Sequence, residues 1–205
     1  MNGPKGSLNM TYAHRDKLPP MMDTADFIEW PGDGTDLRYE LVDGVLRAMA
    51  PGSDAHNTII SNLVVILAAQ LKRTRPGCRV VSAPGIQPHV RAAWNFRIPD
   101  LGVTCTPNKA GEIMTPDPVL LIEVLSPSNT NETWENVMAY TTLPSVHEIV
   151  VVHSTRVKAE LLRRDANGHW PPNPDAVEAG GLVALTSIDA SFALAGVYAG
   201  THLAG

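Results

Sequence analysis

The chain has 205 residues, of which 44% are hydrophobic and 18% are charged, and its formal net charge is −5. Such a composition is typical of a globular protein with one sizeable core, and the length is short for two complete domains. The acidic balance argues against tight non-specific binding to nucleic acid, which depends on Lys and Arg at the phosphates, although a bound metal can supply positive charge locally.

The two ends of the chain differ in composition from its middle. Residues 1–20 mix Gly, Pro, Asn and Lys without a period, which predicts a disordered lead-in without a secretory signal. The longest apolar run, residues 63–69, is far too short to span a membrane. We therefore expect a cytoplasmic protein with a folded core at residues 21–168. A Pro-rich loop and C-terminal extension, residues 169–205, is expected to pack on that core.

Two local sequence signals predict the first elements of the fold. Asp23 or Thr24 can cap a short helix that runs to Glu29. Further on, Asp43-Gly44 separates two β-rich runs, and Asp-Gly supplies the positive φ angles that a two-residue type I′ turn requires. The sequence therefore predicts a β-hairpin made of residues 38–42 and 45–49.

A long helix is predicted next, beginning near Ala55 and capped by Ser53 or Asp54, because apolar residues recur there at helical spacing. The pattern then turns to β, with a short helix at residues 131–140. Strands are predicted at residues 79–82, 85–91, 100–105, 119–125, 148–152, 157–162 and 181–185. This order of elements predicts an α/β (α+β) fold in which helices pack against a mixed sheet.

The cysteines, Cys78 and Cys105, have no CxxC pairing. Two thiols in a chain of this length are more typical of buried small hydrophobic residues than of a disulfide framework. We expect them to be unpaired, which weakly favours a reducing compartment.

Two acidic residues are the strongest candidates for chemistry. Glu123 interrupts an otherwise apolar run of a predicted central strand, where a carboxylate is costly unless it is paired, protonated or bound to metal. Asp100 begins another predicted strand, and the connection between the two is long enough for them to be neighbours. If both side chains share a face, their repulsion favours a divalent cation, and oxygen ligands favour Mg²⁺ or Mn²⁺ over zinc. A structural salt bridge is the alternative interpretation.

Several short segments, in the same order, resemble the PD-(D/E)XK nuclease superfamily and specifically its Uma2 family. Pro99-Asp100 is followed by Glu123-Val124-Leu125-Ser126-Pro127-Ser128. The other similar segments are Tyr39-Glu40-Leu41-Val42-Asp43-Gly44, Met49-Ala50-Pro51-Gly52 with His56, and Tyr140 followed by Pro144-Ser145-Val146 and Glu148. The resemblance covers roughly residues 26–164. It implies a restriction-endonuclease-like mixed sheet flanked by helices.

The resemblance also implies roles for individual residues. Asp100, Glu123 and the backbone carbonyl of Val124 would hold Mg²⁺ or Mn²⁺, with Glu40 as an auxiliary acid and His56 beside the metal. Judged alone, Glu40 is an acid on an edge hairpin that is more often solvated, and His56 is more often a capping or hydrogen-bonded histidine. The implied activity is hydrolysis of DNA phosphodiester bonds, and cutting both strands would suit a homodimer.

One departure from the family pattern bears on activity. Leu125 stands where the superfamily places a lysine, and Asn136 stands on the following helix where a basic residue can replace it. The candidates for a substitute cation are Arg47, Arg97 and Lys109. The alternative function is a catalytically weak or inactive nuclease-fold protein that binds nucleic acid or a protein, and a different metal-dependent hydrolase is a third possibility. A binding module could use the basic residues Lys72, Arg73, Arg75, Arg79 and Arg91.

Overall fold

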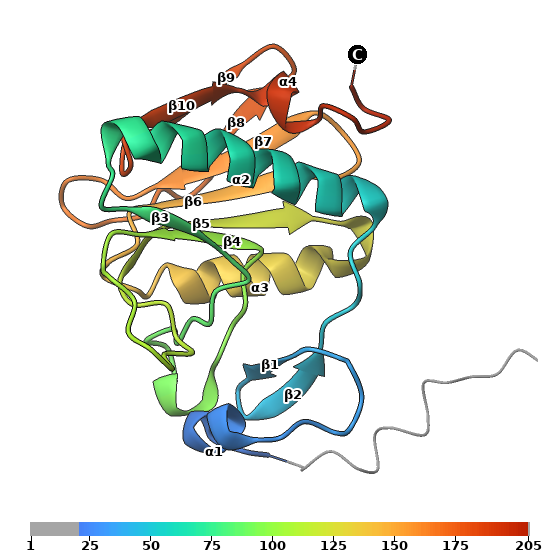
Figure 1. Cartoon of the computed structure of the whole chain (residues 1–205), viewed down its shortest axis with the longest axis vertical. Coiled ribbons are helices and arrows are strands. Elements are labelled where there is room, and N and C mark those ends of the chain that lie inside the picture. Colours follow the sequence, from blue (N-terminus) through green and yellow to red (C-terminus); the bar gives the residue numbers. More distant parts are fainter. Residues whose placement is uncertain (1–20, 205) are drawn as a thin grey trace, which may run out of the picture.

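A six-stranded mixed sheet between two helices forms the centre of the protein (Figure 1). The computed structural model describes residues 21–204, so the predicted lead-in, residues 1–20, lies outside the described residues. The strands lie in the order β3-β4-β5-β6-β7-β8, and β5 pairs with β6 in parallel while the other neighbours are antiparallel. Their bounds are β3 Arg79–Ser82, β4 Leu101–Thr104, β5 Pro118–Leu125, β6 Glu148–His153, β7 Lys158–Arg163 and β8 Asp175–Glu178. The predicted α/β fold is confirmed.

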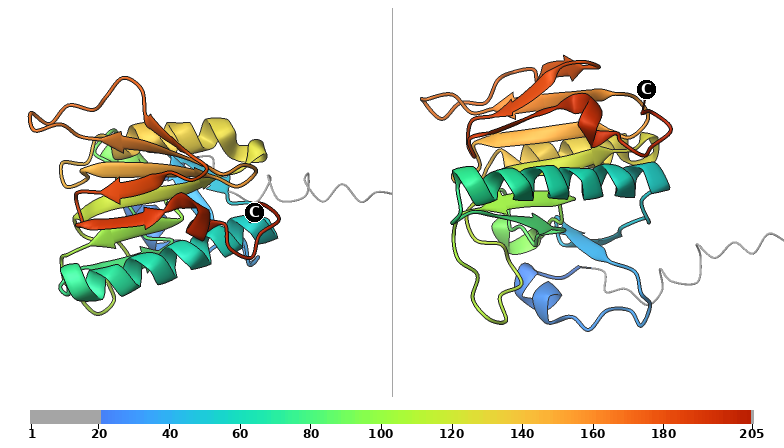
Figure 2. Two further views of the ribbon diagram at one scale, coloured as in Figure 1. Left: turned by 90° about the horizontal axis from the view of Figure 1, so that it is seen from above. Right: turned by 45° about the horizontal axis from the view of Figure 1, so that its top comes forward.

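The two long helices cover opposite faces of this sheet (Figure 2). Helix α2 (Asp54–Thr74) packs on the face that carries Ile122 and Val124, and α3 (Thr130–Tyr140) packs on the face that carries Leu121 and Leu125. Side chains alternate along a strand, so Glu123 must face α3. Strand β5 has neighbours on both sides, as its apolar sequence predicts. Within the described part of the chain, no helix is long and apolar enough to cross a membrane.

The local signals near the N-terminus are confirmed. The side chain of Asp23 caps α1 (Thr24–Glu29), and the side chain of Ser53 caps α2. Asp43 and Gly44 adopt φ angles of 50° and 84° between β1 (Tyr39–Val42) and β2 (Val45–Ala48). This hairpin is a sheet of its own, and backbone hydrogen bonds between Leu41 and Phe96 attach it to the rest of the protein.

The C-terminal part adds elements to both the sheet and the α2 layer. Strand β8 extends the central sheet, while β9 (Leu182–Leu185), β10 (Ala190–Ala193) and α4 (Leu194–Val197) pack beside α2. The strand predicted at residues 181–185 corresponds to β9, whereas β8 and β10 were not predicted. Two short 3₁₀ helices, η2 (Ala92–Trp94) and η3 (Pro127–Asn129), complete the described elements.

The strand predicted at residues 85–91 is wrong. Only Gly85 and Ile86 form isolated bridges, and the chain then turns away. Pro88 has no N–H for a ladder, and the N–H groups of His89 and Val90 donate instead to the hydroxyl of Thr142. A side chain from a distant segment therefore takes the hydrogen bonds that a neighbouring strand would need.

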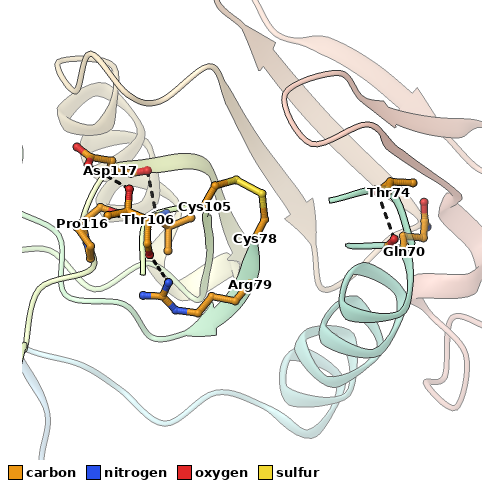
Figure 3. The surroundings of a disulfide bond; sticks show 9 residues. Gln70, Thr74, Cys78, Arg79, Cys105, Thr106, Pro116 and Asp117 are labelled. Carbon is orange, nitrogen blue, oxygen red and sulfur yellow. Dashed lines mark hydrogen bonds between the residues drawn. A yellow bond between two sulfur atoms is a disulfide. The ribbon is translucent and has the colours of Figure 1, made fainter. Parts of the chain in front are cut away.

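The prediction of unpaired thiols is also wrong, because Cys78 and Cys105 form a disulfide bond (Figure 3). Arg79 pairs with Thr104 at the end of the β3–β4 ladder, so the next residues outward, the two cysteines, face each other. The guanidinium of Arg79 also donates to the carbonyl of Thr106. The disulfide therefore closes the end of this ladder, and the expectation of a reducing compartment loses its basis.

Candidate active site

Asp100 and Glu123 lie opposite each other on neighbouring strands. Leu101 pairs with Ile122 in the antiparallel β4–β5 ladder, so the register places Asp100, just before β4, across from Glu123. Both residues line one hollow of about 280 Å³. We call it the acidic hollow, and its other functional lining residues are Glu40, Arg47, His56 and Asn136. The structure thus brings together the side chains to which the resemblance gave a role at the metal, namely Asp100, Glu123, Glu40 and His56, with Asn136 beside them.

Glu123 is a buried carboxyl group in this hollow. It is 7% exposed, and its Oε1 accepts a hydrogen bond of 2.8 Å from the hydroxyl of Tyr140. Burial raises the pKa of Glu123 well above its ordinary value, and the negative charges of Asp100 and Glu40 raise it further. The bond from Tyr140 opposes that rise. A positive charge close to Glu123 would therefore stabilise its ionised form.

Asp100 is fixed by backbone and by His56. The N–H of Val124 donates to Oδ2 of Asp100 at 2.7 Å, and Nε2 of His56 lies 3.4 Å from the same oxygen. Burial lowers the pKa of His56, but Asp100 and the backbone of Val124 outweigh it, so the pKa is raised overall. Nδ1 of His56 has no hydrogen-bond partner among the described residues. A Cβ at Gly52 would lie 2.5 Å from that nitrogen, so a residue without a side chain is needed there.

Arg47 reaches from the hairpin to α3. Its Nη2 lies 2.7 Å from Oε2 of Glu40 and donates to Oδ1 of Asn136 at 2.8 Å. The opposite oxygen of Glu40 accepts from the N–H of Ile98 at 2.8 Å, so Glu40 is buried and held from both sides. Arg47 therefore brings its positive charge to Asn136, the helix position at which a lysine was missing. Lys109 does not line the hollow.

Comparisons with known proteins agree with the resemblance. The sequence model of the Uma2 family, described as "Putative restriction endonuclease", matches residues 24–193. This chain belongs to the Uma2 family. An uncharacterised protein of Synechocystis sp. is 27% identical over 192 residues, which are 92% of this chain and 97% of the relative. A crystal structure from Anabaena variabilis, titled as a "putative nuclease", has a TM-score of 0.68 and 16% identity, and the match covers 86% of this chain and 97% of the other. The Uma2 chain and that protein share a fold.

The donor set of this Uma2 chain suits a hard divalent cation. Among residues 21–204, no group of three or more His, Cys, Asp or Glu side chains is arranged to hold a metal ion. An ion here would draw on the carboxylates of Asp100 and Glu123, with backbone and water oxygens completing its shell. Mg²⁺ typically binds in this way, through one or two carboxylates while keeping several waters. The ion would also supply the positive charge that buried Glu123 lacks.

Two members of the site were not predicted from the Uma2 sequence. Tyr140 was noted only as a helix end and as part of a similar segment, yet it lies four residues after Asn136 and therefore on the same face of α3. Gly52 was noted only as part of a motif, yet it makes room for the ring of His56. Helical spacing could have indicated Tyr140. The packing at Gly52 depends on how the preceding loop folds against the helix.

Proposed function

We propose that this protein is a Mg²⁺- or Mn²⁺-dependent endonuclease that hydrolyses DNA phosphodiester bonds in the acidic hollow. The observation that carries the proposal is the juxtaposition of Asp100 with buried Glu123 on adjacent strands, in a hollow that solvent can reach. Membership of the Uma2 family supports a nuclease activity and a nucleic-acid substrate.

Each residue of the acidic hollow has its own role in this proposal. Asp100 and Glu123 would hold the ion, with the carbonyl of Val124 as a third protein ligand. When bound, such an ion polarises a phosphoryl oxygen and lowers the pKa of a bound water. Tyr140 orients Glu123, while His56 and the N–H of Val124 orient Asp100. Such supporting hydrogen bonds fix the geometry of ligating carboxylates.

Arg47 takes the place of the family lysine in this proposal. The guanidinium can face a phosphate oxygen while Glu40 and Asn136 hold it in place. Asn136 supplies no charge itself and acts as the support for Arg47. Cutting both strands of a duplex requires two hollows, so the proposal includes a homodimer.

A binding module without catalysis is the second candidate, and Leu125 at the lysine position favours it. Lys72 and Arg73 lie exposed at the C-terminal end of α2, with Arg75 just beyond it. Arg91 is not part of this basic surface, because its guanidinium pairs with Asp43 at 3.0 Å. A basic surface on this end of α2 would then contact nucleic acid or a protein partner.

The two candidates are separated by nicking of supercoiled plasmid in Mg²⁺ or Mn²⁺. Wild type should nick the plasmid. The nicking rates of Asp100→Asn and Glu123→Gln should be lower by about 100-fold or more. Glu178→Gln, an exposed acid on β8, is the matched control and should nick normally. Equal trace activity in all four proteins would identify a contaminant and favour the binding module.

Metal binding provides a readout besides activity. An ion that binds the folded form alone raises the melting temperature in proportion to the logarithm of its concentration. Millimolar Mg²⁺ or Mn²⁺ should raise the Tm of wild type and of Glu178→Gln, but not of Glu123→Gln. No shift in wild type would contradict the metal site directly.

A further inference from the structure

A second hollow, wide open to solvent, lies along α3 beside the acidic hollow. Its volume is about 610 Å³, within the range of sites for small molecules. Trp134 and Met138 lie four residues apart and so share one face of α3, and together with Ala139 they give the apolar part of its lining. Arg97 and Asn131 are among the polar residues that line it. We call this cavity the side pocket.

The side pocket and the acidic hollow meet at one ion pair. Glu135 lines the side pocket, and Arg47 lines the hollow. Nη1 of Arg47 lies 3.3 Å from Oε2 of Glu135. A ligand long enough to occupy both spaces would therefore pass over this pair. A nucleic-acid strand has that length, because sugars and phosphates alternate along its backbone and each sugar carries a base.

Arg97 is a buried residue of the side pocket whose hydrogen-bond donors are only partly paired. The residue is 5% exposed, and its Nη2 donates to Oδ1 of Asn95 at 2.9 Å. Its Nε and Nη1 have no hydrogen-bond partner among the described residues. Buried donors of a charged group are rarely left unpaired, because the lost hydration is costly. These two nitrogens are closed off from solvent, so a ligand oxygen would reach them only after a shift of the Arg97 side chain, which lines the side pocket.

The remaining charges of the side pocket are balanced. Arg91 pairs with Asp43 at 3.0 Å, and Glu135 pairs with Arg47. The pocket therefore combines an aromatic and aliphatic wall with a single cation, Arg97, that has no ion pair among the described residues. That combination suits a flat, neutral ring with carbonyl oxygens better than it suits a phosphate, which would need several free cations.

We propose that the side pocket receives an unstacked nucleobase of the strand whose phosphodiester lies in the acidic hollow. The proposal rests on the proposed endonuclease function. The ring of Trp134 offers a face for stacking, as aromatic side chains do in proteins that bind single strands. Arg97 donates to a carbonyl oxygen of the base. Because a base must leave the helical stack to enter, the preferred substrate is single-stranded DNA or a duplex with unpaired nucleotides.

The test measures binding of fluorescein-labelled octathymidylate in EDTA, by anisotropy, so that no cleavage occurs. Met138→Glu places a carboxylate in the side pocket, and Met138 is 63% exposed, so the fold should be retained. The Kd of Met138→Glu for octathymidylate should rise about tenfold or more, because the stacking of one base is lost. Met114→Glu is the matched control, because Met114 is also exposed but lies outside the side pocket, and its Kd should be unchanged.

Two further measurements locate the base and define the substrate. Octathymidylate should quench tryptophan fluorescence in wild type, and Trp134→Leu should lose most of that quenching while circular dichroism confirms its fold. A G·C-rich hairpin duplex, which stays paired at the assay temperature, should bind about tenfold more weakly, because paired bases cannot enter.

The outcomes separate this inference from the proposed function. Equal Kd values for Met138→Glu and Met114→Glu would overturn the side pocket as a base site, even where wild type nicks plasmid normally. Equal binding of the single strand and the duplex would overturn it too. A weakened Kd in Met138→Glu together with absent nicking in wild type would support the pocket and contradict the endonuclease. If Met138→Glu changes only the sedimentation coefficient, the pocket is a self-association surface and the inference fails.

Discussion

The hydroxyl of Tyr140 donates a hydrogen bond of 2.8 Å to Oε1 of Glu123, and both side chains are buried. The bond lowers the pKa of Glu123 against the stronger effect of burial. It joins α3 to the central strand at the carboxylate that we propose as a metal ligand. Helix position and site geometry are therefore coupled through this one contact.

Tyr140→Phe should weaken Mg²⁺ or Mn²⁺ binding about 10- to 100-fold, the usual cost of removing a group that orients a ligand. The hydroxyl is lost while the ring still packs. Isothermal titration calorimetry with Mn²⁺ measures the effect. Tyr198→Phe is the control, because Tyr198 is equally buried and donates to the carbonyls of His153 and Lys158, away from the hollow. Equal losses in both variants would contradict a specific role for Tyr140.

Arg47→Met should reduce plasmid nicking about 10²- to 10³-fold, the effect of removing one donor from a reacting centre. Arg156→Met, an exposed arginine on the loop after β6, should leave the rate unchanged. Adding Asn136→Lys to Arg47→Met places a cation at the family position and should recover part of the rate. Failure of that double variant, with the fold intact, would argue that Arg47 acts only by holding the hairpin to α3.

Glu148→Gln should destabilise the protein by about 2 kcal/mol near neutral pH, because hydrogen bonds to a buried charge are lost. Burial raises the pKa of Glu148, but hydrogen bonds from Ser187, Arg163 and Thr186 outweigh it and hold the pKa below its ordinary value. Because the pKa of Glu148 is lower in the folded state, its ionised carboxylate stabilises the fold at pH values above the unfolded pKa of about 4.5. This stabilisation is lost as the pH falls through the folded-state pKa.

Urea unfolding at several pH values checks this prediction. The stability difference between wild type and Glu148→Gln should be full at pH 7 and shrink below about pH 4.5. Glu178→Gln, at an exposed position, should show little difference at any pH. A gap between wild type and Glu148→Gln that persists unchanged to pH 2 would contradict the ionised state of Glu148.

Removing the disulfide with Cys78→Ser/Cys105→Ser should lower the free energy of unfolding by about 2–4 kcal/mol, because the closed loop restricts the unfolded chain. Denaturation in guanidinium chloride with and without dithiothreitol measures it. Wild type should approach the double variant in reductant, and the double variant should not respond. A wild type that ignores reductant, and whose two cysteines react with a thiol reagent after unfolding without reductant, would show that the bond is absent in solution.

The elements that could be predicted from the sequence are those set by neighbouring residues. Asp43-Gly44 makes its turn with φ angles that the residues themselves favour, and Ser53 caps the next helix. Glu123 was located because one acid stands out in an apolar strand. The length of the connection allowed Asp100 and Glu123 to be neighbours, and the resemblance to the Uma2 family is what paired them at one metal site.

The misplaced elements depend on contacts between distant segments. Residues 85–91 fail as a strand because Thr142, more than fifty residues later, takes the backbone hydrogen bonds. Cys78 and Cys105 face each other only because of the register between β3 and β4. The contact between Arg47 and Asn136 likewise joins a hairpin to a helix, so composition and spacing could name Arg47 as a candidate but could not choose it.

The parallel pairing of β5 with β6 also governs when the acidic hollow can form during translation. Parallel neighbours need a crossover, here through α3, so β5 gains its second partner only after residue 153 has left the ribosome. Until then the strand with Glu123 is an open edge on its β6 side, where its backbone N–H and C=O groups have no partner strand. The strand that carries Glu123 is therefore completed only late in the synthesis of the chain.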